Sequence, residues 1–328
     1  MLLSVIAIIL GLALLVWGAE RFISGAAALA RNLGVSPMLI GLTIVGFGTS
    51  APEILVSATA ALKDSPGLAI GNAIGSNIAN IGLILGVTAL IQPLLVHSST
   101  LRREYPVLLI VTLGTLLLML NGTLGRMDRV VLLLGLVATL YFMYRLGLAS
   151  RVNDPNDPMG PGFDAEIPRD LSTRAAVGWF IAGLAVLLLS SHILVWGAVN
   201  IATAFGVSEL VIGLTIIALG TSLPELAACV AGALKNEHDI AIGNIIGSNL
   251  YNLLAVLAMP ALLAPSLLDP AVLLRDMPVM IALTLALFVM GYGVRSRGEI
   301  TRMEGMVLVA AYLGYQGYLF SQLSGTWA

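Results

Sequence analysis

Two acidic residues, Glu53 and Glu225, lie in the otherwise apolar segments GFGTSAPE and ALGTSLPE. In each segment a threonine stands four residues before the acid and a serine three residues before it, so in a helix the three side chains share one face. The proline before each acid has no N–H, which leaves a glycine carbonyl four residues earlier without its helical partner. Each segment therefore gathers a carboxylate, two hydroxyls and a free carbonyl, from Gly48, Thr49 and Ser50 in the first and Gly220, Thr221 and Ser222 in the second.

A second polar motif, GSN, follows each acidic segment. Ser76 is followed by Asn80 four residues later, and Ser248 is followed by Asn252 in the same way. On a helix, residues four apart are neighbours on one face. Each motif therefore offers a hydroxyl and an amide oxygen side by side.

Placing the two charged glutamates within the bilayer costs free energy. A charged side chain at the centre of a membrane helix costs about 2.5–3.5 kcal/mol on insertion scales. No predicted span offers a Lys or Arg near its middle as a partner, so the acids must be protonated or bound to cations. Two carboxylates match the charge of one Ca²⁺, which prefers oxygen ligands. Zinc and copper favour His or Cys ligands, which these segments lack.

The composition explains why lipid is the relevant solvent. Hydrophobic residues make up 58% of the 328 residues and charged residues only 10%, whereas a soluble domain carries about 25% charged residues. This excludes a secreted, cytosolic or nucleic-acid-binding protein. A single cysteine excludes a disulfide framework and a cysteine-based metal site.

Apolar runs long enough to cross a bilayer predict an all-α membrane protein with ten transmembrane helices. The distribution of Lys and Arg favours both termini outside the cell, with twelve basic residues on the inner side and four on the outer side. The runs are 3–30, 37–62, 68–92, 104–120, 128–146, 175–200, 208–234, 240–264, 277–294 and 303–321.

The acidic segments belong to an internal repeat. Residues 40–80 and 212–252 align without a gap, and 22 of the 41 positions are identical. The offset of 172 residues spans five predicted helices, an odd number, so the second copy enters the membrane from the opposite side. Many secondary transporters are built from such inverted repeats, with the substrate site near the midplane. We therefore expect two inverted five-helix repeats, 1–146 and 175–328, joined by a cytoplasmic linker, 147–174.

At these motifs the chain resembles the cation/Ca²⁺ exchanger superfamily, the sodium/calcium exchangers, and in particular its bacterial members without a regulatory domain. The resemblance rests on GTSAPE and GTSLPE, each followed by GNxIGSN, and covers essentially the whole chain. It implies a secondary active antiporter in the cell's inner (plasma) membrane that exchanges Na⁺ for Ca²⁺, with no cofactor, no nucleic acid and no obligate protein partner.

The resemblance also implies roles for individual residues. Glu53 and Glu225 would be the central ligands that Ca²⁺ and Na⁺ share. The other ligands would be hydroxyl or carbonyl oxygens of Thr49, Ser50, Thr221 and Ser222, backbone carbonyls of Gly46 and Ala218, and side chains of Ser76, Ser248, Asn80 and Asn252. The asparagines stand where some members of the family carry an acid at one of the two positions.

Exchange is expected to proceed by alternating access, with the first and sixth spans sliding across a fixed core. Charge arithmetic supports coupling, because an empty site of charge −2 should cross the membrane poorly. Ca²⁺ neutralises this charge, and three Na⁺ leave +1. Moving one net charge couples to voltage by about 2.3 kcal/mol per 100 mV.

Several alternatives remain open at the level of sequence. The nearest is an H⁺/Ca²⁺ antiporter of the same fold, followed by a K⁺-dependent exchanger. An intramembrane hydrolase using Ser50 or His192 is disfavoured because the chain lacks HExxH and GxSxG. An ion channel is a further alternative, which a saturable flux requiring a counter-ion would exclude.

Overall fold

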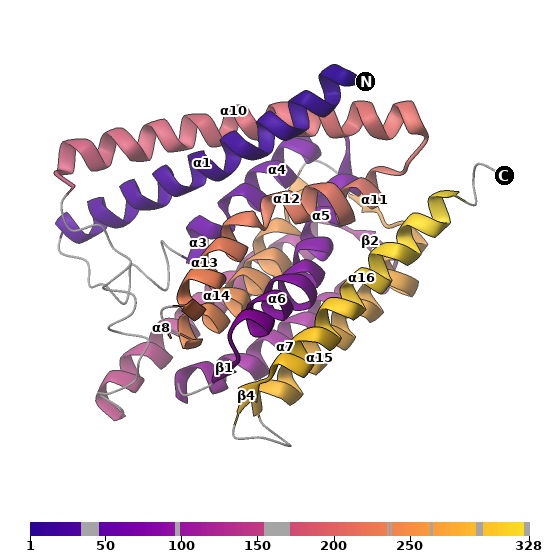
Figure 1. Ribbon diagram of the computed structural model, residues 1–328. Helices are drawn as coiled ribbons and strands as arrows, with labels where there is room; N and C mark the ends of the chain where they lie inside the picture. Colours follow the sequence, from indigo (N-terminus) through magenta and orange to yellow (C-terminus); the bar gives the residue numbers. More distant parts are fainter. Residues whose placement is uncertain are drawn as a thin grey trace.

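Long apolar helices form nearly all of the structure (Figure 1). The computed structural model describes residues 1–33, 46–95, 99–153, 171–234, 236, 238–262, 265–292 and 298–324. The start of the second predicted run, 37–45, lies outside the described residues, as does most of the predicted linker, 154–170. The helical elements otherwise follow the predicted apolar runs to within several residues.

The first half of the chain contains mostly helices, several of them interrupted. Its elements are α1 (Leu2–Asn32), α3 (Gly46–Thr49), α4 (Ala51–Leu62), α5 (Pro66–Ala79), η2 (Asn80–Leu85), α6 (Gly86–Ile91), β1 (Leu94–Leu95), α7 (Ser99–Met119), β2 (Thr123–Leu124) and α8 (Arg126–Asn153). Helix α8 continues through residues 147–153, which were predicted to belong to the linker, since no proline occurs in this stretch before Pro155.

The second half repeats the same pattern. Its elements are α10 (Thr173–Phe205), α11 (Glu209–Ile212), η3 (Gly213–Ile217), α12 (Ala218–Thr221), α13 (Leu223–Leu234), α14 (His238–Tyr251), η4 (Asn252–Val256), η5 (Pro260–Leu262), β3 (Ser266–Leu267), η6 (Val272–Asp276), α15 (Met277–Tyr292), β4 (Glu299–Ile300) and α16 (Arg302–Ser324). Four of the η segments are π-helical, namely η2, η3, η4 and η6, and η5 is a 3₁₀ turn.

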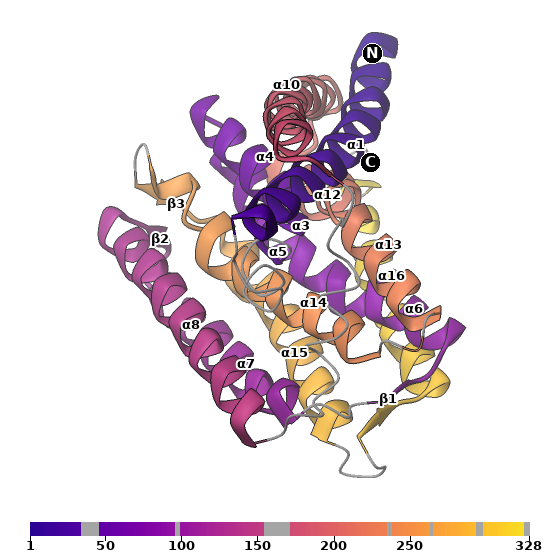
Figure 2. The same ribbon diagram turned by 90° about the vertical axis from the view of Figure 1, so that its left-hand side faces the viewer.

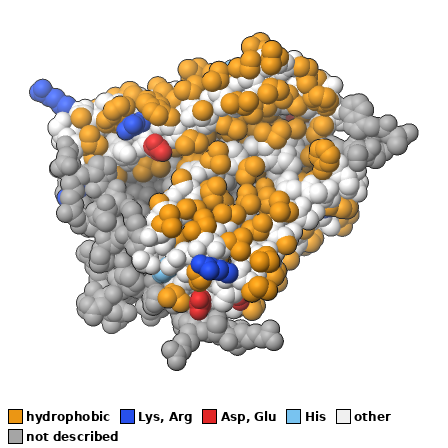
Figure 3. Space-filling model, in the orientation of Figure 1, with side chains coloured by type: hydrophobic (Ala, Val, Ile, Leu, Met, Phe, Trp, Pro, Cys, Tyr) orange, Lys and Arg blue, Asp and Glu red, His pale blue; other side chains and the backbone are white. Residues whose placement is uncertain are grey.

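By length and hydropathy, four described helical stretches are suited to cross a bilayer. They are Leu2–Asn32, Pro66–Ile91, Thr173–Phe205 and Val272–Gly291. A fifth is added if Glu209–Thr221 and Leu223–Leu234, which meet at an angle of 43°, form one broken span. The surface agrees with a lipid environment: hydrophobic side chains cover much of the face in Figure 3, and few charged ones interrupt them.

Helices α1 and α10 pack side by side along one edge of the molecule, across the remaining helices (Figures 1 and 2). Small residues let the two backbones approach closely, as is common in membranes. A Cβ atom at Gly25 would lie only 2.4 Å from the backbone nitrogen of Phe180. The Arg21 guanidinium lies over the Trp179 ring, 4.8 Å from its centroid, which adds a cation–π contact between the helices.

Helix α5 lies inside the helical core and is covered on all sides. Of the most apolar window in Pro66–Ile91, 78% is buried inside the structure. Gly71 brings α5 against the second half of the chain, because a Cβ there would lie 2.4 Å from the carbonyl oxygen of Leu210. The polar residues of α5 are therefore held away from lipid.

Two short antiparallel strand pairs tie the halves together at opposite ends of the helical bundle (Figures 1 and 2). Strand β1 pairs with β4, with Leu94 opposite Ile300. Strand β2 pairs with β3, with Thr123 opposite Leu267. Each pair joins a loop of the first half to a loop of the second.

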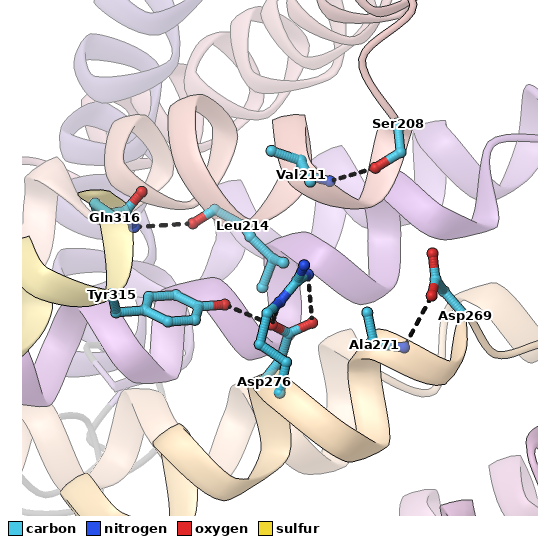
Figure 4. Close-up of polar contacts among 9 residues, drawn as sticks. Ser208, Val211, Leu214, Asp269, Ala271, Asp276, Tyr315 and Gln316 are labelled. Carbon is cyan, nitrogen blue, oxygen red and sulfur yellow. Dashed lines mark hydrogen bonds and ion pairs between the residues drawn. The ribbon is translucent and has the colours of Figure 1, made fainter. Parts of the chain in front are cut away.

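A polar cluster connects η6 to α16 (Figure 4). The Arg275 guanidinium donates to both carboxylate oxygens of Asp276, at 2.6 and 3.1 Å. The hydroxyl of Tyr315 donates to the same carboxylate at 2.8 Å. The neighbouring Gln316 donates to the carbonyl of Leu214 in η3 at 3.4 Å. Asp276 is thus a buried acid whose charge is fully compensated by protein groups.

Candidate cation site

Two broken helices position the paired glutamates. In the first half, α3 ends at Thr49 and α4 begins at Ala51, so the break falls at Ser50. In the second half, α12 ends and α13 begins on either side of Ser222. The proline that follows each break is the second residue of the new helix, where its missing N–H costs no helical bond. Each glutamate therefore lies in the first turn of a helix that starts inside the molecule.

Helices α5 and α14 bring the GSN motifs to the same region. Ser76 and Ser248 lie in these α-helices, and a π-helical segment begins at Asn80 and at Asn252. A π-helical turn leaves backbone groups out of the regular ladder and is frequent at functional sites. All four side chains are fully buried.

A serine hydroxyl donates a hydrogen bond to each glutamate, and one of these bonds connects the two acidic segments. Both glutamate side chains have no exposed surface. The hydroxyl of Ser222 donates to Oε1 of Glu53 at 3.2 Å, and that of Ser248 donates to Oε1 of Glu225 at 3.2 Å. Because Ser222 is only three residues before Glu225, the first bond brings the two acidic segments together. Within the described residues, neither glutamate forms an ion pair with Lys or Arg, in contrast to Asp276.

Six buried side-chain oxygens from the predicted ligands have no hydrogen-bond partner among the described residues. An unsatisfied buried polar group costs about 1–3 kcal/mol, and more if it is charged. Such a concentration of unsatisfied acceptors is the pattern expected where a cation binds. The oxygens are Ser50 Oγ, Glu53 Oε2, Ser76 Oγ, Asn80 Oδ1, Glu225 Oε2 and Asn252 Oδ1.

The remaining predicted ligands lie on the same helical segments as these oxygens. The hydroxyl oxygens of Thr49 and Ser248 are 3.4 Å apart. Thr221 Oγ1 lies 3.3 Å from the carbonyl oxygen of Ala218, which begins α12. Gly46 begins α3, three residues before Thr49. Every predicted ligand therefore lies on one of the four broken or π-bulged helical segments.

Two residues that the sequence analysis left without a role also belong to this region. Asn72 accepts a hydrogen bond from Thr221 at 3.1 Å, and Asn244 accepts one from Thr49 at 3.4 Å. Both contacts join one half of the chain to the other. The sequence did contain a signal for these residues, because an asparagine occurs at the same position of both repeats, inside apolar segments.

The donor set determines the chemistry that the site can perform. Its side-chain atoms are carboxylate, hydroxyl and amide oxygens, which suit hard cations such as Ca²⁺ and Na⁺. Ca²⁺ takes about six to eight such oxygens. A site with two carboxylates and several neutral oxygens is suited to bind and release cations.

Comparison with known proteins agrees with this chemistry. The profile of the family described as "Sodium/calcium exchanger protein" matches residues 3–145 and 175–321. The chain is 50% identical over 321 residues to the putative antiporter CaxA of Alkalimonas amylolytica, covering 98% of this chain and 100% of CaxA. It is 39% identical over 320 residues to the inner membrane protein YrbG of Escherichia coli, covering 98% of both.

A solved structure shares the fold. The sodium-calcium exchanger NCX_Mj, in a crystal soaked with Na⁺ and Sr²⁺, superposes with a TM-score of 0.65 at 34% sequence identity, covering 95% of this chain and 97% of that one. The matched regions include both acidic segments and both GSN motifs. The chain therefore belongs to the sodium/calcium exchanger family of membrane cation antiporters.

Proposed function

We propose that the protein is a secondary active antiporter that exchanges Na⁺ for Ca²⁺ by alternating access, with Glu53 and Glu225 at the centre of its cation site. The observation that carries this proposal is the set of six unsatisfied buried oxygens on the predicted ligands, two of which belong to glutamates without basic partners in the described chain. The family of the chain and the sodium-calcium exchange named for NCX_Mj support the choice of ions.

Charge accounts for obligatory exchange at such a site. With both carboxylates ionised, the empty site carries −2, and burying that charge without compensation is costly. One Ca²⁺ neutralises it, whereas three Na⁺ leave a net charge of +1. The site can therefore change the side on which it opens when it holds either cargo, and the empty form crosses slowly.

The proposed architecture is ten spans in two inverted five-helix repeats. The strand pairs support it, because β1 and β3 are separated by the repeat offset of 172 residues and each pairs with the other half. The two threonine–asparagine contacts are also counterparts at this offset. If the halves are related by an inverted two-fold axis, each contact from the first half to the second has a counterpart from the second half to the first.

The membrane orientation follows the same scheme. We place both termini outside the cell in the plasma membrane, and the 147–174 linker in the cytoplasm between repeats 1–146 and 175–328. Each strand pair joins two loops that this topology puts on one side of the membrane, with β1 and β4 inside and β2 and β3 outside. The family profile matches two segments that flank the linker, which also supports the division.

Flux measurements test the exchange directly. We expect purified protein in liposomes loaded with Na⁺ to accumulate ⁴⁵Ca²⁺ when the outside is Na⁺-free, and Glu53→Gln and Glu225→Gln to abolish this uptake. Glu20→Gln, which changes an exposed acid of α1, should transport like the wild type. Retained uptake in either site variant would remove that glutamate from the proposal.

The same preparation separates the related alternatives. Liposomes carrying a pH gradient without Na⁺ report an H⁺/Ca²⁺ antiporter, and liposomes with and without K⁺ report a K⁺-dependent exchanger. We expect the Na⁺ gradient alone to drive uptake, because hydroxyl and amide oxygens coordinate Na⁺ without titrating. Equal uptake with and without Na⁺ contradicts sodium coupling.

A further inference from the structure

Two hydrogen-bond relays lie behind the threonines of the candidate site, and each links a threonine of one half of the chain to residues of the other half. In the first, Thr221 Oγ1 donates to Asn72 Oδ1, Asn72 Nδ2 donates to Ser57 Oγ at 2.9 Å, and Ser57 Oγ donates to the carbonyl of Ala69 at 3.4 Å. Ser57 and Asn72 have no exposed surface. The relay therefore runs from the candidate site into the protein interior.

The second relay has the same order of contacts. Thr49 Oγ1 lies 3.4 Å from Asn244 Oδ1, Asn244 Nδ2 donates to Cys229 Sγ at 3.6 Å, and Cys229 Sγ donates to the carbonyl of Ala241 at 3.3 Å. Every member is separated from its counterpart by 172 residues. The one chemical difference is that Cys229 takes the place of Ser57.

The direction of the first relay is fixed by its far end. A backbone carbonyl only accepts, so the hydroxyl hydrogen of Ser57 points to Ala69 and its oxygen accepts from Asn72. The amide nitrogen of Asn72 also donates to the backbone carbonyl of Glu53 at 3.1 Å. Asn72 must therefore present its oxygen, and not its nitrogen, to Thr221.

This direction has a consequence for cation binding. A hydroxyl carries one hydrogen and two lone pairs, and it coordinates a cation through a lone pair. If the hydrogen of Thr221 points to Asn72, its lone pairs are left for the cation. Two other acceptors lie near this hydroxyl, the carboxylate of Glu53 and the carbonyl of Ala218, the latter at 3.3 Å against 3.1 Å for Asn72. The Ala218 carbonyl already accepts the backbone N–H of Ser222 at 3.2 Å, and with the Thr221 hydrogen on Asn72 its second lone pair is left for a cation.

We infer that Asn72 and Asn244 are positioning residues that orient the hydroxyl hydrogens of Thr221 and Thr49 away from the cation site, so that both threonines act as cation ligands. The inference rests on the proposed function, because it assigns these residues to the same site. The first relay holds its threonine more strongly, since its two contacts to Asn72 are shorter than those to Asn244 and a hydroxyl accepts a hydrogen bond more strongly than sulfur does. Asn72 therefore matters more than Asn244.

Equilibrium binding of ⁴⁵Ca²⁺ to the purified protein in detergent tests this pairing without requiring transport. We expect Asn72→Leu to raise the Kd for Ca²⁺ by about tenfold, and Asn244→Leu to raise it less. In a Thr221→Val background, Asn72→Leu should add less than a twofold change, because the hydroxyl that it orients is already gone. In a Thr49→Val background it should keep its full effect.

The double variant of Asn72→Leu with Thr49→Val is the matched control for the double variant with Thr221→Val. A residue that merely stabilised the fold would weaken binding equally in both threonine backgrounds, and that result overturns the inference. An unchanged Kd in Asn72→Leu overturns it as well. If Asn72→Leu does not fold, Ser57→Ala removes only the acceptor behind Asn72 and should show the same dependence on Thr221 with a smaller rise in Kd. If the wild-type protein does not bind Ca²⁺, the proposed function itself fails.

Discussion

At the scale of single residues, the structure contains two kinds of buried acid. Asp276 accepts three hydrogen bonds, two from Arg275 and one from Tyr315, so its charge is balanced within the fold. Glu53 and Glu225 each accept one serine hydrogen bond and keep a second oxygen without a partner in the described chain. The charge of the first kind is balanced within the fold, whereas in the proposed function a bound cation balances the charge of the second kind.

This difference predicts that substitutions of the two kinds of acid change the melting temperature, and its dependence on Ca²⁺, in different ways. A ligand present at a hundred times its Kd stabilises the native state by about 2.7 kcal/mol, so Ca²⁺ should raise the melting temperature of the wild type. Glu53→Gln should melt at least as high as the wild type in chelator, because it removes an uncompensated buried charge, and Ca²⁺ should not raise it further. Asp276→Asn should melt lower at every Ca²⁺ concentration. Calorimetry in detergent measures all three, and a Ca²⁺-dependent rise in Glu53→Gln contradicts the assignment.

At the scale of elements, close helix contacts hold the broken helices in place. Gly71 of α5 lies against the backbone of α11 and η3, which lead to Ala218 and Thr221. The carbonyl of Leu214 in η3 also accepts from Gln316 of α16. The position of the second acidic segment therefore depends on packing between helices that are far apart in the sequence.

Glycine substitutions test this dependence. In Gly71→Ala the new methyl would lie 2.4 Å from the Leu210 carbonyl and 2.9 Å from the Leu214 nitrogen, so backbone must move. Overpacking of this kind costs about 1–3 kcal/mol, and we expect a lower melting temperature together with weaker Ca²⁺ binding. Gly114→Ala, where nothing lies within 4 Å, is the control and should be neutral or slightly stabilising. Equal behaviour of the two variants would show that the contact is unimportant.

At the scale of the whole molecule, the two halves exchange contacts at both ends of the bundle. The pairing of β1 with β4 and of β2 with β3 gives each end one strand from each half. In the proposed topology these ends face opposite sides of the membrane. The long helices α1 and α10 pack on each other at the edge of this core (Figure 2). In the proposed alternating access, these two helices would slide across the core.

Cysteine labelling in whole cells tests the topology. Cys229 is the single native cysteine and is fully buried, so Cys229→Ser provides a suitable background. A membrane-impermeant maleimide should label Asn121→Cys and Leu267→Cys in intact cells, because both lie at the proposed outer end. Leu95→Cys should react only after the membrane is permeabilised. Labelling of all three in intact cells would contradict the inverted arrangement.

Sequence alone was enough to predict the membrane class, the internal repeat and the types of ligand, because each prediction depends on local spacing or on composition. An intramembrane glutamate that occurs twice at matched positions, beside Thr, Ser and Pro, predicts a cation site before any contact is known. The helical segments also followed from apolar length, apart from ends such as that of α8, which continues past Gly147.

The contacts between the two halves of the chain could be found only from the three-dimensional structure. The bond from Ser222 to Glu53 spans 169 residues and that from Thr221 to Asn72 spans 149, and neither follows from helical periodicity. The same holds for the difference between Asp276, which is compensated, and Glu53, which is not. Hydrogen-bond satisfaction depends on the groups that packing brings within about 3 Å, and the order of residues along a helix does not contain that information.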